Sequence, residues 1–264
     1  MPAVFLAAWA AIPQVACAQT VHVSARSDLF DAGDPAPSPE RGGLLPPEIP
    51  LPPRTIAVEF GPVTGAAAGG PAWPVVGPDG GTQTANGPHG TNVLSADGIA
   101  GLIAPRFGFL AGVFLAAETP PEGEEPPRLD FRDLGADFPS LAPAIAQTFF
   151  IGDGRTAAGA VQSFVVPRGA TRLFLGYIDA FAFGWPDGRP PALYTDNSGS
   201  FTAEVRPIPA CNADADLDGR VTVWDLLRYL GQFRSRDPEA DRVPPATVDV
   251  ADLLSFLRAY VAGC

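Results

Sequence analysis

Three aspartates at alternate positions open the C-terminal fifth of the chain. Asp214, Asp216 and Asp218 are followed by Gly219, and glycine allows the sharp turn that brings alternate side chains together. Carboxylate oxygens gathered in this way suit a hard cation such as Ca²⁺, which takes roughly six to eight oxygen ligands. The spacing therefore predicts a calcium-binding loop.

Further oxygen donors follow in the order that such a loop requires. If Asp214 is position 1, Arg220 falls at position 7 and would offer its main-chain carbonyl. Thr222 at position 9 would ligate directly or through water, and Asp225 at position 12 lies in the first turn of a predicted helix. We expect metal binding to be coupled to folding of this segment. The alternative is a solvated acidic turn, because aspartate is a common helix cap.

The loop and its helix belong to a repeated unit. The stretch Val221–Phe233 returns as Val248–Tyr260, 27 positions later, with matching valines, Asp-Leu-Leu runs and aromatic residues. Such self-similarity indicates a duplicated supersecondary unit. Each copy predicts a helix of about three turns, which is marginal alone in water. We expect the two helices to pack through apolar faces formed by Val223, Leu226, Leu227 and Leu230 and by Val250, Leu253, Leu254 and Leu257.

The loop of the second copy is degenerate. Residues without carboxylates, Val243, Pro245 and Ala246, occupy the positions that correspond to two of the aspartates and to the glycine. The remaining side-chain candidates are Asp241, Asp249 and Asp252. We therefore expect this copy to keep a structural role rather than a strong calcium site.

The duplicated loop and helix, with aspartate at position 12 and the Asp-Leu-Leu run behind it, resemble a dockerin module. Cys211 and the Gly263-Cys264 end resemble the variety found at the C-termini of secreted planctomycete-type bacterial proteins. The resemblance covers Cys211 to Cys264, and six liganding positions of the first copy match in register. It implies that one helix face docks onto a cohesin-like or cell-envelope protein.

The N-terminal residues 1–18 predict a secretory signal peptide. Ala3 to Ile12 is an apolar core of suitable length, and Ala16 to Ala18 gives a small-x-small cleavage site before Gln19. The absence of Lys and Arg near the start departs from the usual pattern, and Gln14 disfavours a lipoprotein signal. We expect the mature protein to be secreted and extracellular, or else periplasmic or attached to the cell surface.

Two cysteines, Cys211 and Cys264, remain after that cleavage and bracket the repeats. In an oxidising compartment such a pair predicts a disulfide, and the alternative is two free thiols. The formal net charge of −12 disfavours nucleic-acid binding, which needs a basic face. No stretch is long and apolar enough to predict a membrane span.

The region between the signal and the repeats has the pattern of a β protein. Short apolar runs separated by turn-forming residues predict strands at Val21–Phe30, Thr55–Phe60, Gly112–Leu115, Ala160–Val166, Arg172–Tyr177 and Ser200–Val205. The proline-rich run Asp34–Pro53 is expected to be a surface loop or an edge crossing. The predicted fold is mostly β: a jelly-roll or Greek-key β-sandwich over residues 19–207, followed by a small α-helical, dockerin-like module over residues 208–264.

A second set of oxygen donors lies at the ends of two predicted strands. Asp179 ends one strand, and Asp196 and Asn197 precede the next. If the intervening loop folds back, these side chains converge and suit a calcium ion that in turn holds sugar hydroxyls. The alternative is an Asx-turn that leads into the last strand.

This pairing resembles the calcium-dependent galactose-binding lectins of the PA-IL type. Asp179 matches the aspartate of that family, Asp196 and Asn197 match its Asn-Asn pair before Ser-Gly-Ser-Phe, and Leu193 falls where a main-chain carbonyl would ligate. Residues 180–192 replace a much shorter loop, and Asp196 replaces an asparagine. The resemblance implies galactose-type glycans as ligands. His89 is a candidate sugar contact.

Catalysis has little support in the sequence. The only histidines are His22 and His89, and neither a Gly-x-Ser-x-Gly elbow nor a His-Glu-x-x-His motif occurs. A carboxylate pair for glycoside hydrolysis stays open, with Glu118, Asp130, Asp133 and Asp137 as candidates. We expect a non-catalytic carbohydrate-binding or adhesion protein. The alternatives are a polysaccharide-degrading dockerin protein and a structural envelope protein.

Overall fold

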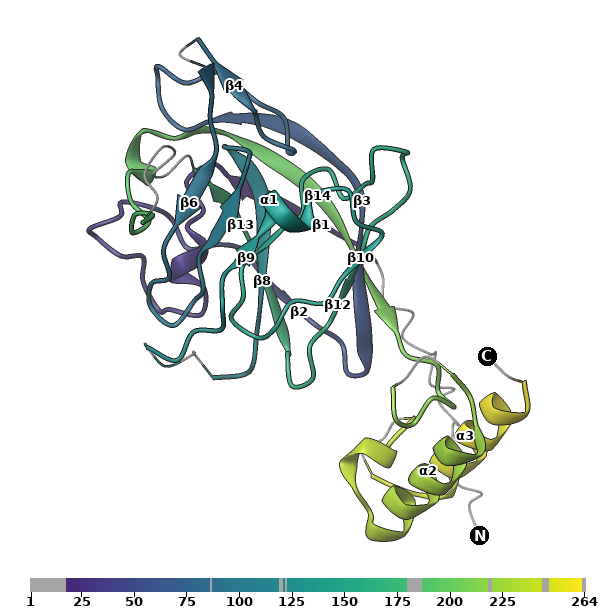
Figure 1. Cartoon of the computed structure of the whole chain (residues 1–264). Coiled ribbons are helices and arrows are strands. Elements are labelled where there is room, and N and C mark those ends of the chain that lie inside the picture. Colours follow the sequence, from purple (N-terminus) through teal and green to yellow (C-terminus); the bar gives the residue numbers. More distant parts are fainter. Residues whose placement is uncertain are drawn as a thin grey trace, which may run out of the picture. The chain divides into compact units, whose positions relative to one another are not determined.

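A computed structural model describes residues 18–85, 87–118, 121, 123–179, 187–217, 220–243 and 247–262. The fold is mostly β, with several antiparallel and mixed sheets followed by two C-terminal helices (Figure 1). This confirms the predicted secondary-structure class. The described chain divides into a β-rich unit, Ala18–Ile208, and a C-terminal unit that begins at Pro209.

Two larger sheets form most of the β-rich unit. The five-stranded sheet has the order β1 (Gln19–Ser24), β14 (Ser198–Pro209), β3 (Thr55–Ala68), β12 (Ser163–Val165) and β10 (Ser140–Leu141). The four-stranded sheet has the order β11 (Phe149–Phe150), β8 (Phe109–Leu115), β13 (Arg172–Ile178) and β2 (Glu48–Pro50). Neighbours in these orders are mostly far apart in sequence, so the chain crosses repeatedly between strands.

Smaller elements lie between these strands. The short strands are β4 (Gln83–Thr84), β5 (Gly87–Pro88), β6 (Thr91–Val93), β7 (Leu102–Ala104) and β9 (Leu129–Asp130). The single-turn helices are η1 (Leu29–Asp31), α1 (Phe131–Leu134) and η2 (Tyr194–Asp196). Elements this short hold their shape through caps and tertiary contacts rather than through their own hydrogen bonds.

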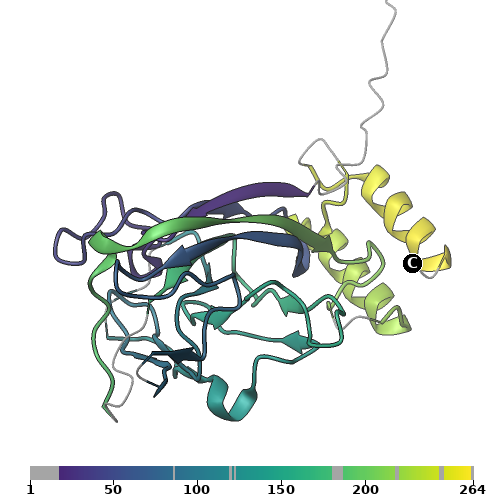
Figure 2. The same cartoon turned by 90° about the horizontal axis from the view of Figure 1, so that it is seen from above.

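The core of the β-rich unit lies between the two larger sheets. Every residue of β8 is buried, as expected of a short continuous apolar run. Phe149 of β11 contacts Phe164 of β12 with ring centroids 5.2 Å apart, and Tyr177 of β13 lies 6.2 Å from Phe201 of β14. These aromatic pairs join the sheets, and Figure 2 shows β1, β14 and β3 side by side in one layer.

The sequence located the long strands better than the short ones. Strands β3, β8, β12, β13 and β14 overlap predicted segments. The predicted strand at Val21–Phe30 ends at Ser24 as β1, because the Asp28 side chain accepts a hydrogen bond from the Phe30 amide and caps η1 instead. Strand β2 lies within the proline-rich run and at an edge of its sheet, where proline is tolerated.

The C-terminal unit contains α2 (Val223–Ser235), η3 (Pro238–Ala240) and α3 (Val250–Ala262). Both helices lie where the repeat predicted them. The rings of Tyr229 and Phe256, which are 27 positions apart, stack in parallel with centroids 3.9 Å apart. The repeat-related pairs Tyr229–Phe233 and Phe256–Tyr260 lie 6.2 and 6.0 Å apart. The duplication in the sequence is therefore also a duplication of contacts.

The predicted packing face of these helices is wrong in part. Five of the expected core residues are exposed: Val223, Leu227, Leu230, Val250 and Leu254. Only Leu226, Leu253 and Leu257 of the expected set pack against the core. The rings of Tyr229 and Phe256 form the centre of the interface, and a helix buries only a narrow strip of its surface. The buried strip of each helix is therefore centred on the aromatic residues and not on the predicted leucines and valines.

Candidate functional site

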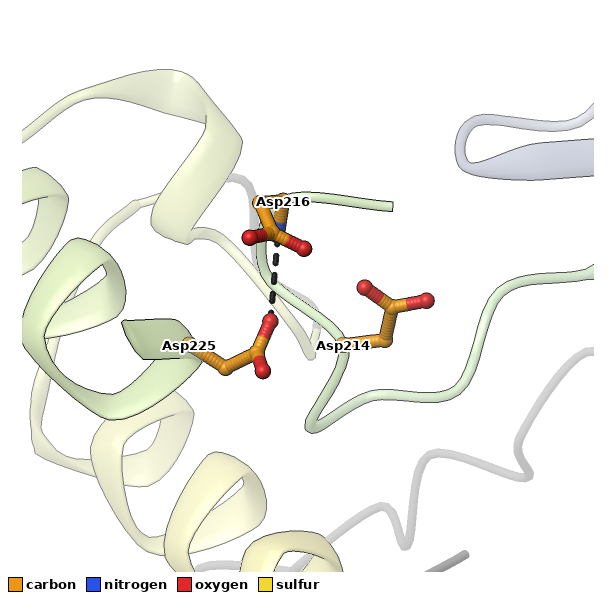
Figure 3. Close-up of side chains that lie close together, drawn as sticks. All are labelled: Asp214, Asp216 and Asp225. Carbon is orange, nitrogen blue, oxygen red and sulfur yellow. Dashed lines mark hydrogen bonds between the residues drawn. The ribbon is translucent and has the colours of Figure 1, made fainter. Parts of the chain in front are cut away.

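Three aspartates of the predicted calcium loop lie close together. Asp214, Asp216 and Asp225 each offer a carboxylate oxygen, and these oxygens all lie within 4.8 Å of one another (Figure 3). Asp214 and Asp225 are buried, and Asp216 is exposed. Among the residues that the structure describes, no other group of three or more acidic, histidine or cysteine side chains meets this criterion. Asp218 and Gly219 lie outside the described residues.

The first turn of α2 fixes the position of Asp225. The Thr222 hydroxyl accepts a hydrogen bond from the Trp224 amide at 3.2 Å. The Asp225 carboxylate accepts one from the Thr222 amide at 2.7 Å and one from the Thr222 hydroxyl at 3.1 Å. This reciprocal capping box begins the helix at Val223. Thr222 therefore serves as the helix cap, and the side chain of Arg220 is exposed.

The other oxygen of Asp225 holds the loop. It accepts hydrogen bonds from the amides of Ala215 at 2.8 Å and Asp216 at 3.2 Å, the second of which is drawn in Figure 3. Burial raises the pKa of the Asp225 carboxyl, but the hydrogen bonds from Thr222, Ala215 and Asp216 outweigh it. The pKa lies below its ordinary value, so Asp225 is ionised at neutral pH.

The oxygen donors of the first loop fit a hard divalent cation. Two buried carboxylates and one exposed carboxylate supply negative charge without any nitrogen or sulfur ligand, and this donor set is the one that Ca²⁺ prefers. Of the predicted ligands, the structure brings together Asp214, Asp216 and Asp225.

The candidate residues of the second copy have mainly structural contacts. The Asp252 carboxylate accepts hydrogen bonds from the amides of Arg242 at 2.6 Å, Val243 at 2.9 Å and Asp249 at 2.8 Å. The Asp249 carboxylate accepts from the Ala251 amide at 2.7 Å. Burial, together with the charges of Asp252 and Asp249, raises the pKa of Asp241. The three acids lie near one another but do not meet the distance criterion that the first loop meets.

The second predicted site gathers around two glycines. Asp179 follows β13, Asp196 ends η2, and both face the Gly69-Gly70 turn that follows β3. A Cβ atom at Gly69 would lie 2.1 Å from Oδ1 of Asp179, and one at Gly70 would lie 2.7 Å from Oδ2 of Asp196. A side chain at either position would force the neighbouring carboxylate to move. The sequence analysis did not single out Gly69 and Gly70. Two successive glycines at the end of a strand nevertheless indicate that another part of the chain approaches the backbone closely.

Asn197, which follows Asp196, is the third predicted ligand of this site. Its side chain is buried, and its Nδ2 donates to the Ala25 carbonyl at 3.0 Å. Its Oδ1 has no hydrogen-bond partner within the described part of the chain. A buried acceptor without a donor is unfavourable, and a cation would satisfy it. Leu193, the proposed source of a carbonyl ligand, has a left-handed backbone with φ of 64° and an exposed side chain.

An aromatic-walled cavity of about 820 Å³ lies beside this site. Its lining includes Trp73, His89, Gln83 and Thr84. The rings of Trp73 and His89 meet edge to face with centroids 5.6 Å apart. Cδ1 of Trp73 lies 3.4 Å from where the Cβ of a residue at Gly70 would be, and Asp196 faces the same position. The cavity and the Asp196 carboxylate are therefore neighbours.

An ion network with a buried centre, which the sequence did not predict, supports the turn that carries Asp196. The Arg41 guanidinium pairs with Asp28 and Asp97 at 2.5 Å each and also with Asp31. The main-chain carbonyl of Arg41 accepts a hydrogen bond from the Tyr194 amide at 3.1 Å. Burial raises the pKa of Asp28 to about 6, although Arg41 opposes the shift. The network thus ties the proline-rich segment to η2.

Two of the candidate carboxylates for hydrolysis, Asp130 and Asp137, make structural contacts. Asp130 caps α1 and pairs with Arg132 at 2.5 Å, and this hydrogen bond lowers the pKa of Asp130. Asp137 accepts a hydrogen bond from the Ala157 amide at 2.7 Å. A general acid for glycoside hydrolysis needs a raised pKa, and the pKa of Asp130 is shifted in the opposite direction.

Two further predictions depend on residues outside the described part. Cys264 lies there, so its disulfide with Cys211 stays a prediction; the Cys211 sulfur accepts a hydrogen bond from the Ala213 amide at 3.3 Å. The signal segment also lies there up to residue 17, and β1 begins at Gln19. None of the described helices has the length and apolar character needed to cross a bilayer.

Comparison of the chain with protein-family models, with curated proteins and with solved structures finds no match.

Proposed function

We propose that this chain is a secreted, non-catalytic protein that binds carbohydrate with the help of Ca²⁺ and docks onto a partner through its C-terminal unit. The observation that carries the first part is the placement of Asp179 and Asp196 against the successive glycines Gly69 and Gly70, beside an aromatic-walled cavity. A cation site next to an aromatic wall is suited to a ligand with both hydroxyl groups and an apolar face.

We further propose that the β-rich unit is a β-sandwich of the jelly-roll or Greek-key kind, related in design to the PA-IL-type lectins. The non-sequential order β1-β14-β3-β12 supports this, because it requires crossings between the sheets. The aromatic contacts between the two larger sheets also support it.

In this proposal, four groups hold the ion: the carboxylates of Asp179 and Asp196, Oδ1 of Asn197 and the carbonyl of Leu193. Bound there, Ca²⁺ supplies coordination positions for sugar hydroxyl oxygens. Trp73 offers an apolar ring face to the sugar, and His89 and Gln83 offer polar groups in the same cavity. The buried Asp179 and Asn197 are held in place by the packing of β13 and β14, so the site is largely formed before the ligand arrives.

The experiment is a calorimetric titration of the full chain with galactose and with galactosides, in Ca²⁺ and in excess EDTA. We expect binding only with Ca²⁺. Trp73→Ala should weaken sugar binding at least tenfold and leave calcium binding unchanged. Trp224→Ala, which alters an exposed tryptophan of the C-terminal unit, is the matched control and should change neither. Equal binding in EDTA would contradict the proposal, and release of reducing sugar would favour the hydrolase alternative.

The C-terminal unit is proposed to bind a second Ca²⁺ through its first loop and to dock through α2. Asp214, Asp216 and Asp218 would hold the ion, with Asp225 beside them. The proposed docking face of α2 consists of Val223, Trp224, Leu227 and Leu230, all exposed, and Gly231, whose missing side chain would meet open space.

Glycine inside a helix costs about 1 kcal/mol relative to alanine, and nothing within 4 Å requires Gly231 in this chain. A partner that approaches the α2 backbone closely would explain why glycine occupies position 231, because any larger side chain would lie between the two surfaces. Binding of the full chain to a recombinant cohesin domain tests the docking part. Trp224→Ala should abolish binding, whereas Leu254→Ala on α3 should not. Loss through Leu254→Ala alone would assign docking to the other helix.

A further inference from the structure

The aspartate at position 12 of each copy holds its loop against its helix in the same way. One oxygen of Asp225 accepts the amides of Ala215 and Asp216, at 2.8 and 3.2 Å. One oxygen of Asp252 accepts the amides of Arg242 and Val243, at 2.6 and 2.9 Å. In both copies these donors lie ten and nine residues before the aspartate.

The second oxygen repeats the pattern at the start of the helix. It accepts the Thr222 amide at 2.7 Å in the first copy and the Asp249 amide at 2.8 Å in the second. Both aspartates are fully buried. The donors of the two copies are related by the same shift of 27 positions as the stacked rings of Tyr229 and Phe256. The contact is therefore a property of the repeat and not of one loop.

The hydrogen bonds of Asp225 use its capacity as an acceptor. An ionised carboxylate offers about four lone-pair sites. Asp225 receives four hydrogen bonds, from three amides and the Thr222 hydroxyl. A cation that took Asp225 as a ligand would have to displace some of these donors.

The degenerate second loop acts as a natural control. It has Val243 and Pro245 in place of two aspartates and Ala246 in place of the glycine, and it nevertheless keeps all three main-chain contacts of Asp252. The contacts therefore do not require the metal-ligand pattern. Because they join each loop to its helix, they supply the constraint that a bound ion would otherwise supply.

We propose that Asp225 and Asp252 are positioning residues that staple each loop to its helix without metal, so that the C-terminal unit keeps its fold in the absence of a cation. This differs from the calcium-coupled folding expected from the sequence. It does not depend on the proposed function, because the staples form whether or not Asp214 and Asp216 bind an ion. The ion then adds stability to the first loop alone.

The test is hydrogen–deuterium exchange of the full chain in excess EDTA, followed by mass spectrometry of peptides from the two loops. In the wild type, we expect the amides of Ala215, Asp216, Arg242 and Val243 to stay protected. Asp225→Ala should speed exchange in the first loop at least tenfold and leave the second loop protected. Asp252→Ala should do the reverse.

Two further variants separate stapling from ion binding. Asp214→Asn should weaken Ca²⁺ binding, measured with the metal alone, and leave the exchange in EDTA unchanged. Asp225→Asn keeps one acceptor oxygen, so its first loop should exchange at a rate between those of the wild type and Asp225→Ala. If Asp225→Ala unfolds the whole unit while Asp214→Asn stays folded, the staple is supported as well.

Rapid exchange of both loops and both helices in wild-type protein with EDTA, reversed by Ca²⁺, would overturn the proposal. So would unchanged exchange in Asp225→Ala. Failure of Ca²⁺ to bind at all would remove the proposed calcium function of the first loop and leave the staples in place, provided that the loops stay protected. The two failures are therefore distinguishable.

Discussion

Arg41 holds together carboxylates that would otherwise repel one another. It is the one cation that contacts Asp28 and Asp31, both almost fully buried, among the described ion pairs. Removing one partner of a buried ion pair costs about 3–5 kcal/mol, because the other charge stays buried without compensation. We expect Arg41→Gln to lower the free energy of unfolding of the β-rich unit by about that amount at pH 7, measured by urea denaturation.

Arg132 provides the matched control for this substitution. It also pairs with an aspartate, Asp130, but its side chain is 59% exposed, and exposed pairs contribute little. Arg132→Gln should not change the denaturation midpoint measurably. If the two arginine variants behave alike, the Arg41 network is not a stabilising element.

Asp28 makes the free energy of unfolding depend on pH in the direction opposite to that of most paired aspartates, whose pKa is lowered in the folded state. Burial raises its pKa from 3.8 to about 6 in the folded state, so the folded protein binds more protons than the unfolded chain between these values. The contribution of Asp28 to stability is present below pH 4 and is lost as the pH rises through about 6. Between pH 7 and pH 5, we expect wild type to gain about 1 kcal/mol relative to Asp28→Asn, measured by urea denaturation. A relative loss would mean that Arg41 dominates the pKa.

The two predicted metal sites and the Arg41 network differ in how well their residues could be identified from the sequence. Asp214 and Asp216 lie in one loop, so their spacing alone predicted their convergence. Asp179 and Asp196 were paired because each adjoins a predicted strand. Arg41 and Asp97 are 56 positions apart, and no local pattern links them. The network depends on the folding of the proline-rich segment, which has no periodicity.

In the turn after β3, one added Cβ atom at Gly69 would disturb the predicted site of Asp179 and Asp196. Gly69→Ala would place a Cβ 2.1 Å from Oδ1 of Asp179, so the carboxylate must move. We expect this variant to lose one of two calcium sites in a calorimetric titration and to lose galactose binding. Gly77→Ala is the control, because nothing lies within 4 Å of its Cβ. Equal calcium binding by the two variants would mean that Asp179 is not a ligand.

The helices show why elements were easier to predict than their faces. The repeat located α2 and α3 to within about two residues at each end, because the apolar period of a helix can be read from local sequence. Leu227 and Tyr229 both fit an apolar helical period. Local sequence does not decide which of the two side chains faces the core. The choice depends on the stacking of Tyr229 on Phe256, which exists only once the two copies meet.

The same limit applies to the sheets. The runs that became β8 and β13 are apolar enough to be recognised as buried strands. Short strands such as β10 and β11, of two residues each, carry no pattern and are defined by their partners. The strand order follows from long-range pairing, for example of Gln19 with Val205 in β1 and β14. Local sequence therefore predicted the class of fold but not its topology.

Within the described residues there are two separate hydrophobic clusters, and this predicts two unfolding events. The cluster of the β-rich unit includes Phe164, and the much smaller cluster of the C-terminal unit is built around Tyr229 and Phe256. A small core leaves less stability after the loss of chain entropy. In differential scanning calorimetry we therefore expect two transitions, with the C-terminal unit unfolding at the lower temperature.

Variants in each cluster assign the two transitions. Truncating a buried phenylalanine costs about 3–5 kcal/mol, so Phe256→Ala should lower or abolish only the first transition, and Phe164→Ala should lower only the second. Added Ca²⁺ should raise the first transition if Asp214 and Asp216 bind it, and the second if Asp179 and Asp196 do, because a ligand stabilises only the unit that holds it. A single transition that both variants lower together would show that the two clusters unfold as one cooperative core, and the independence of the units would then be wrong.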